Sequence, residues 1–73
     1  MNRKRSVTIR GHRTSFSLED EFWDLLTRIA ADRDMPLSRL VSEIDRNRDL
    51  DHNLSSATRL YVLKWALSDR KDD

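Results

Sequence analysis

The sequence predicts a mainly α-helical protein with one β-strand, assembled as an intertwined homodimer. Three observations predict it: apolar residues alternate with polar ones near the N-terminus, they then recur with helical spacing, and the chain is short. With 73 residues, it forms a single domain that buries only about 60% of the surface exposed on unfolding. Because the sequence has no cysteine, we expect a second copy to supply the missing stability.

The strand is predicted from the alternation of polar and apolar residues between Ser6 and Leu18. Period two with β-branched residues is typical of a strand. Apolar residues occupy odd positions before Gly11, the only glycine, and even positions after it. A bulge or bend at Gly11 would return both sets to one face. A hairpin with its turn at residues 11–13 is the alternative, and the sequence does not choose between them. The apolar positions are Val7, Ile9, Phe16 and Leu18.

A first helix is predicted over residues 19–33, where the apolar period changes to about 3.6. Acidic residues fill its first turn, and basic residues lie near its end, as the helix dipole favours. The sequence Asp34-Met35-Pro36 then breaks the pattern, because proline can begin a helix but cannot continue one. The apolar stripe consists of Phe22, Leu25, Leu26, Ile29 and Ala30, with Trp23 at its edge.

Two further helices follow the break. The second begins near Leu37, carries the stripe Leu37, Leu40, Val41 and Ile44, and is expected to end before Asp45. A polar loop over 47–53 leads to Asn53, a good N-cap, and to a third helix over 54–68. This helix carries Ala57, Leu60, Tyr61, Leu63 and Leu67, with Val62 and Trp65 partly on another side. The remaining segments are a flexible basic arm over 1–5, a strand-and-helix core over 6–46 and a charged tail over 69–73.

A lone strand leaves its backbone N–H and C=O groups unpaired and cannot form a sheet by itself. Pairing with the same strand of a second copy solves this problem, and two-fold symmetry makes that pairing antiparallel. We therefore expect an intermolecular two-stranded ribbon over a shared core. The helical residues expected in this dimer core are Phe22, Leu25, Leu26, Ile29, Leu40, Val41 and Ile44.

The net charge of +1 conceals an uneven distribution. Residues 1–18 carry five basic side chains and no acidic one, whereas the rest of the chain carries nine basic and thirteen acidic side chains. A basic N-terminal segment on a mildly acidic body predicts a polyanionic partner. A mobile solubilising tail would have the same composition, and charge alone favours neither.

Several function classes are excluded by what the sequence lacks. No apolar run approaches the roughly 18–20 residues of a membrane span, and no apolar segment follows the basic start as in a signal peptide. A cytoplasmic protein without membrane contact is therefore expected. His12 and His52 lack ligand spacing, so we predict no metal site, and His12 is assigned to the turn. No grouping of nucleophile and base stands out, so neither a cofactor nor an enzymatic activity is expected.

The stretch RTSFSLEDEFWDLL, followed by IAADRDMPLSRLV, resembles the ribbon-helix-helix family of Arc- and MetJ-type repressors. The resemblance covers about residues 13–46. The longer form, with GHRTSFSLEDEFW and a C-terminal NLSSATRLYVLKW, is similar to a bacterial subgroup of small ribbon-helix-helix proteins. The resemblance implies a homodimeric transcriptional repressor whose β-ribbon lies in the major groove of double-stranded DNA.

The resemblance also implies site residues. The outward strand residues Arg13, Ser15 and Ser17 would contact bases, while Phe16 and Leu18 point into the dimer core. Arginine can donate two hydrogen bonds to guanine, and serine can bond any base edge. The two-fold axis implies a near-palindromic target. For the third of these strand residues an alternative remains, because the spacing Ser-x-x-Asp at 17–20 resembles a helix capping box.

Phosphate contacts are expected in two places. The resemblance implies that the start of the second helix, at Leu37, Ser38 and Arg39, holds a phosphate with free backbone N–H groups. The basic N-terminal segment would add phosphate or minor-groove contacts from Arg3, Lys4, Arg5 and Arg10. Two residues depart from the family pattern: Glu19 stands where proline is frequent and adds a negative charge beside the ribbon, and Pro36 stands where a capping Ser or Thr is frequent.

Two other functions remain open. An antitoxin or adaptor would bind a protein partner through residues 54–68, a helix that carries Tyr61 and Trp65. An oligomerisation module would bind no nucleic acid at all.

Overall fold

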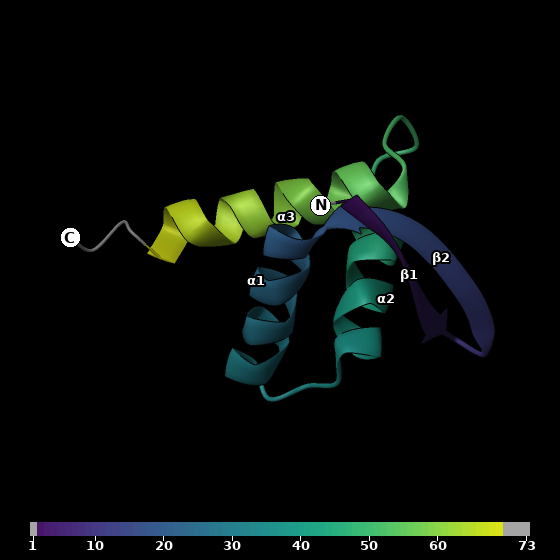
Figure 1. Ribbon diagram of the computed structural model, residues 1–73, viewed down its shortest axis with the longest axis horizontal. Helices are drawn as coiled ribbons and strands as arrows, with labels where there is room; N and C mark the ends of the chain where they lie inside the picture. The colour runs from purple at the N-terminus through teal and green to yellow at the C-terminus, as the bar shows by residue number, and fades with distance from the viewer. Residues whose placement is uncertain (1, 70–73) are drawn as a thin grey trace.

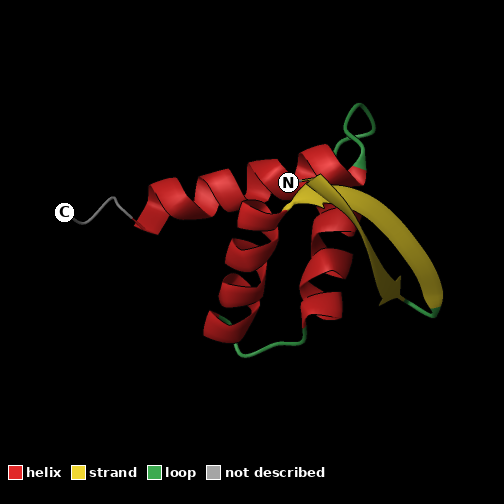
Figure 2. Cartoon of the chain, in the orientation of Figure 1, coloured by secondary structure: helices red, strands yellow, loops and turns green. Residues whose placement is uncertain are grey.

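The computed structural model describes residues 2–69 and consists of a β-hairpin followed by three helices (Figures 1 and 2). Two helices, α1 and α2, run side by side, α3 lies across one end of this pair, and the hairpin curves away on the side of α2. Met1 and residues 70–73, with the ends of the predicted arm and tail, lie outside the described residues. The elements are β1 (Asn2–Ile9), β2 (His12–Glu19), α1 (Asp20–Asp32), α2 (Leu37–Asn47) and α3 (Leu54–Asp69).

The hairpin corrects the prediction of a single strand. Strands β1 and β2 pair antiparallel, with Ile9 opposite His12 next to the turn. The two turn residues, Arg10 and Gly11, have φ values of 50° and 82°, as type I′ hairpin turns require. The hairpin alternative is therefore correct, although its turn lies one residue earlier than expected and no bulge forms. Residues 2–5, expected as a flexible arm, belong to β1.

The change of apolar parity across Gly11 follows from this turn. In a two-residue hairpin, an odd position on one strand faces an even position on the other, so that Val7 lies opposite Thr14 and Arg5 opposite Phe16. Because opposite residues of an antiparallel pair point to the same face, both apolar sets reach one side without a bulge. The hairpin also pairs the strand within one chain, which removes the reason for a dimer based on an unpaired strand; the homodimer itself stays a prediction.

Helix α1 begins after Glu19 and ends in a left-handed turn. No side chain caps its first turn, so the capping role considered for Ser17 is not formed. At the other end Asp34 has a φ of 55°. The Met35 N–H donates to the Ala30 carbonyl and the Asp34 N–H to the Ala31 carbonyl, both at 3.0 Å. This pair of bonds is a Schellman motif with aspartate at the position where glycine is preferred.

The later helix boundaries follow the local signals closely. Helix α2 begins at Leu37 directly after Pro36, as predicted, but continues to Asn47, past the end expected before Asp45. Helix α3 begins after Asn53, whose side-chain oxygen accepts a 2.9 Å hydrogen bond from the Ser56 N–H. The predicted N-cap is confirmed.

The core lies between the inner face of the hairpin and the three helices. Of the nine residues predicted for a dimer core, seven are buried within the single chain, and Phe22 and Leu25 are partly buried. Their role between two copies stays a prediction. The seven are Phe16, Leu18, Leu26, Ile29, Leu40, Val41 and Ile44, and Ile9, Ala30, Leu54 and Val62 complete the cluster.

The face of α3 differs from the prediction. Its buried positions are Leu54, Thr58 and Val62, which lie one turn apart, whereas Leu63 and Leu67 are 50% and 61% exposed. The three leucines of the predicted stripe therefore face solvent. Its other two members, Ala57 and Tyr61, pack partly against the core, as does Trp65, which was expected partly on another side.

Candidate nucleic-acid interface

The outer face of the hairpin, opposite the core, is entirely polar. Successive side chains of a strand alternate between its two faces. Because Phe16 and Leu18 of β2 are buried on the inner face, the positions between and beside them lie on the outer face. The strand register adds a matching row from β1. Six exposed side chains form this outer face in three cross-strand pairs: Lys4 with Ser17, Ser6 with Ser15, and Thr8 with Arg13.

All three residues predicted to contact bases lie on this outer face. Arg13, Ser15 and Ser17 are exposed. Within residues 2–69 the Arg13 guanidinium forms no hydrogen bond or ion pair, and the Ser15 hydroxyl lies 3.0 Å from the Ser6 hydroxyl in a hydrogen bond. The structure thus gathers the predicted set on one accessible surface, and its contact with DNA bases stays a prediction.

The β1 half of the outer face was not predicted from the sequence. Ser6 and Thr8 were given no role, and Lys4 was expected at phosphate without a defined position. The alternation from Ser6 to Arg10, combined with a two-residue turn, would have placed these side chains opposite Ser15 and Arg13.

Two of the predicted phosphate-binding arginines lie on the inner face and are already paired. The Arg5 guanidinium donates a 2.7 Å hydrogen bond to the Asp20 carboxylate and lies 4.7 Å from the centre of the Trp23 ring. Arg3 forms a 3.3 Å ion pair with the same carboxylate. A cation held over an aromatic ring and against a carboxylate is stabilised where it is. These contacts tie β1 to the start of α1.

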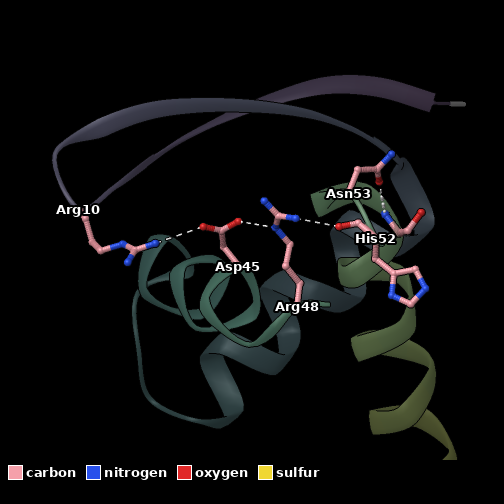
Figure 3. Close-up of polar contacts among 6 residues, drawn as sticks. Arg10, Asp45, Arg48, His52 and Asn53 are labelled. Atoms are coloured by element: carbon pink, nitrogen blue, oxygen red, sulfur yellow. Dashed lines mark hydrogen bonds and ion pairs between the residues drawn. The ribbon is translucent and has the colours of Figure 1, made fainter. Parts of the chain in front are cut away.

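Arg10, at the hairpin turn, is also engaged by its own chain (Figure 3). Its guanidinium lies 3.2 Å from one oxygen of Asp45 near the end of α2. Arg48 donates to the other oxygen at 2.8 Å and to the His52 carbonyl, also at 2.8 Å. A continuous chain of charged contacts therefore links the hairpin turn, the end of α2 and the loop before α3.

The negative charge at Glu19 is neutralised by α3. The Arg59 guanidinium donates to both carboxylate oxygens, at 2.9 and 3.2 Å. This bidentate hydrogen bonding by Arg59 lowers the pKa of Glu19 below its ordinary value. The departure from the family pattern at this position therefore does not leave an uncompensated anion beside the ribbon.

The predicted phosphate site at the start of α2 does not adjoin the hairpin. Pro36 precedes the helix and provides no side-chain cap. Leu37 is half-buried against the core, Ser38 is half-buried and Arg39 is exposed. The Ser17 end of β2 leads into α1, whose length of about 20 Å separates it from the α1–α2 loop (Figure 1). At the turn end of the hairpin, Arg10 meets α2 at Asp45, about 12 Å along the helix from Leu37. Within one chain, the structure does not bring these residues together with Arg13, Ser15 and Ser17.

The three helices are joined by a polar contact at Arg33. Its guanidinium donates to the Glu43 carboxylate at 2.7 Å and to the Tyr61 hydroxyl at 2.8 Å. The hydrogen bond from Arg33 lowers the pKa of Glu43, and the same bond raises the pKa of Arg33. Tyr61 is therefore occupied inside the chain.

Two other features, a metal-ligand cluster and a membrane-spanning helix, are not found in residues 2–69. No group of three or more His, Cys, Asp or Glu side chains is arranged to hold a metal ion in this part of the chain. None of its helices combines the length and apolar character that a bilayer crossing requires.

A model of the ribbon-helix-helix domain family matches residues 2–66. The match spans both strands, α1, α2 and most of α3. No curated protein and no solved structure matches the chain significantly.

Proposed function

The chain belongs to the ribbon-helix-helix domain family, and on that premise we propose that it is a homodimeric transcriptional regulator that binds double-stranded DNA sequence-specifically. Members of this family typically bind DNA, usually as dimers, and are generally not enzymes. The regulator acts as a repressor by occupying a near-palindromic site.

The observation that carries the proposal is the polar outer face of the hairpin, and above all Arg13. A two-stranded ribbon fits the major groove of B-DNA, where arginine can bond the O6 and N7 atoms of guanine. Arg13 is exposed and without a partner in residues 2–69, so that base contact breaks no existing bond. Ser15 and Ser17 extend the same row with hydroxyl groups that can donate or accept.

Two features support the proposed homodimer, the small size of the chain and the edge of β2 that does not pair with β1. Among residues 2–69 the sheet has two strands, and β2 presents a second edge to which an identical β2 can pair antiparallel about a two-fold axis. This pairing places the intermolecular β2–β2 ribbon expected from the sequence at the centre of a four-stranded sheet, with one β1 on each side. Phe16 and Leu18 would then lie next to their counterparts at the centre of the shared core.

Phosphate binding is assigned to the basic groups that remain available. Lys4 on the outer face and Arg39 on α2 have no ion pair among the described residues. The first backbone N–H groups of α2, at Leu37 and Ser38, have no partner within the helix and can donate to an anion.

The test is fluorescence anisotropy with labelled DNA from upstream of the protein's own gene and with a scrambled duplex of equal composition. Arg13→Ala should weaken binding to the specific duplex by about 1–3 kcal/mol and leave binding to the scrambled duplex nearly unchanged. Arg28→Ala is the matched control, since Arg28 is an exposed cation of α1 without an ion pair in the described part of the chain. If Arg13→Ala and Arg28→Ala change both affinities alike, base contact by Arg13 is wrong.

A second candidate function, an antitoxin or adaptor that binds a protein partner through residues 54–68, is favoured by the exposed leucines of α3. Leu60, Leu63 and Leu67 lie at helical spacing and are 38%, 50% and 61% exposed. The C-terminal part of α3 extends past α1 (Figure 1). Replacing the three leucines with serine should abolish binding of a co-purified partner without changing DNA affinity. Loss of the folded protein would instead assign these leucines a structural role.

A further inference from the structure

We propose that β1 supplies a second base-contacting row, in which Ser6 and Thr8 determine sequence specificity together with Arg13 and Ser15. The inference rests on the proposed function and extends it to two residues of β1, Ser6 and Thr8, for which the sequence predicted no role. In the dimer, each β1 then flanks the central pair of β2 strands and contacts bases beside them.

The strand register places Ser6 and Thr8 beside the residues of β2 that are proposed to contact bases. Ser6 lies opposite Ser15 and Thr8 opposite Arg13, and opposite residues of an antiparallel pair point to the same face. Both β1 side chains are exposed. Neighbouring strands lie about 4.8 Å apart, so that a groove surface approached by Arg13 is within reach of Thr8 as well.

The two faces of β1 differ in their chemistry. The inner face carries Ile9 and Val7, which pack against the core, and Arg5, which is paired with Asp20. The outer face carries hydroxyl groups, each of which can donate and accept a hydrogen bond and therefore suits any base edge. The hydroxyls of Ser6 and its β2 partner already share a hydrogen bond, which fixes their spacing across the two strands.

The outer row of β1 is long enough to cover about four base pairs. From Lys4 to Thr8 the outer row of β1 spans about 14 Å, at about 3.4 Å for each residue. This length equals about four base-pair steps of B-DNA. The cross-strand pairs of one hairpin can therefore cover about four base pairs with two rows of side chains.

The test begins with the full-length protein and a library of random duplexes, from which the preferred site is selected. Thr8→Val removes only the hydroxyl and keeps the β-branched shape, and Ser6→Ala does the same for serine. Each variant is compared with the parent on the selected site and on a scrambled duplex. Matched controls are Thr27→Val and Ser68→Ala, exposed hydroxyl residues of α1 and α3.

Each β1 variant should lose about 25-fold in affinity for the selected site, because the dimer loses one hydrogen bond, worth about fivefold, in each protomer. Binding to the scrambled duplex and the melting temperature should remain those of the parent. Equal weakening on both duplexes would mean phosphate contact and overturn base reading by β1. If Thr8→Val and Ser6→Ala keep the parent's preference for the selected site while Arg13→Ala loses it, the inference about β1 is wrong and the proposed function stands. If the parent selects no sequence, the proposed function itself fails, and the inference fails with it.

Discussion

The salt dependence of DNA binding tests which of the predicted phosphate-binding cations are available to DNA. The sequence predicted five cationic side chains at phosphate: Arg3, Lys4, Arg5, Arg10 and Arg39. In the folded chain three of them form ion pairs with Asp20 or Asp45. Only Lys4 and Arg39 are left without a carboxylate partner in the described residues.

The expected slope follows from this count. Each neutralised phosphate contributes about −0.9 to the slope of log K against log salt concentration. Two free cations in each protomer, and hence four in a dimer, give about −4, whereas all five in each protomer would give about −9. Between 50 and 200 mM salt, the first slope corresponds to a loss of affinity of about a hundredfold and the second to about 10⁵-fold.

The assay is fluorescence anisotropy on the selected duplex at four NaCl concentrations. Arg39→Gln should make the slope of the dimer shallower by about 2, because each protomer then neutralises one phosphate fewer. Arg10→Gln should leave the slope unchanged, because that guanidinium is held by Asp45. A parent slope near −9, or an Arg10→Gln effect equal to that of Arg39→Gln, would refute the reasoning that internal ion pairs remove these arginines from the DNA surface.

Two further predictions concern the stability of the fold. Asp34→Gly should raise the free energy of unfolding by about 1 kcal/mol, because Asp34 has a φ of 55° and glycine adopts the left-handed region without strain. Urea denaturation measures this free energy. A loss of stability would show that the aspartate side chain is needed there. Acidification should destabilise the protein, because the hydrogen bond from Arg33 lowers the folded-state pKa of Glu43 below its unfolded value. The stability contributed by this bond is fully present above about pH 4.3. It is lost as the pH falls through the folded-state pKa. The melting temperature of Glu43→Gln, followed from pH 7 to pH 3, should fall less than that of the parent; an equal fall would assign the acid sensitivity to other carboxylates.

Local sequence signals predicted where the helices begin, because each helix start depends on only a few neighbouring residues. Pro36 sets the start of α2 through its fixed geometry, and Asn53 caps α3 through its own side chain. The apolar period of α1 likewise places Leu26 and Ile29 in the core.

The first strand was missed because its stability depends on contacts far along the chain. Arg3, Lys4 and Arg5 have the composition of a mobile tail, yet Arg5 lies between Trp23 and Asp20. No periodicity in residues 2–5 reveals that partner. The turn was hidden for a related reason, since Arg10 adopts a left-handed conformation that arginine rarely takes without tertiary support.

The exposed side of α3 was mispredicted because hydrophobicity alone does not identify the buried side of a helix. Thr58 is fully buried between Leu54 and Val62, while Leu63 faces solvent. The candidate site was predicted in part. The alternation of β2 placed Arg13, Ser15 and Ser17 on one face, and the family resemblance assigned them to bases, but finding their β1 neighbours required the strand register.

The two faces of the hairpin differ in what they contact, and this difference has a consequence for how the sequence can change in evolution. The inner residues, such as Ile9 and Phe16, maintain the core, whereas the outer residues, such as Thr8 and Ser15, are exposed on the side away from it. If the outer row reads bases as proposed, substitutions in it would change target preference with little effect on stability, as expected for surface positions. A duplicated gene could acquire a new operator through a few outward substitutions while its scaffold stays the same.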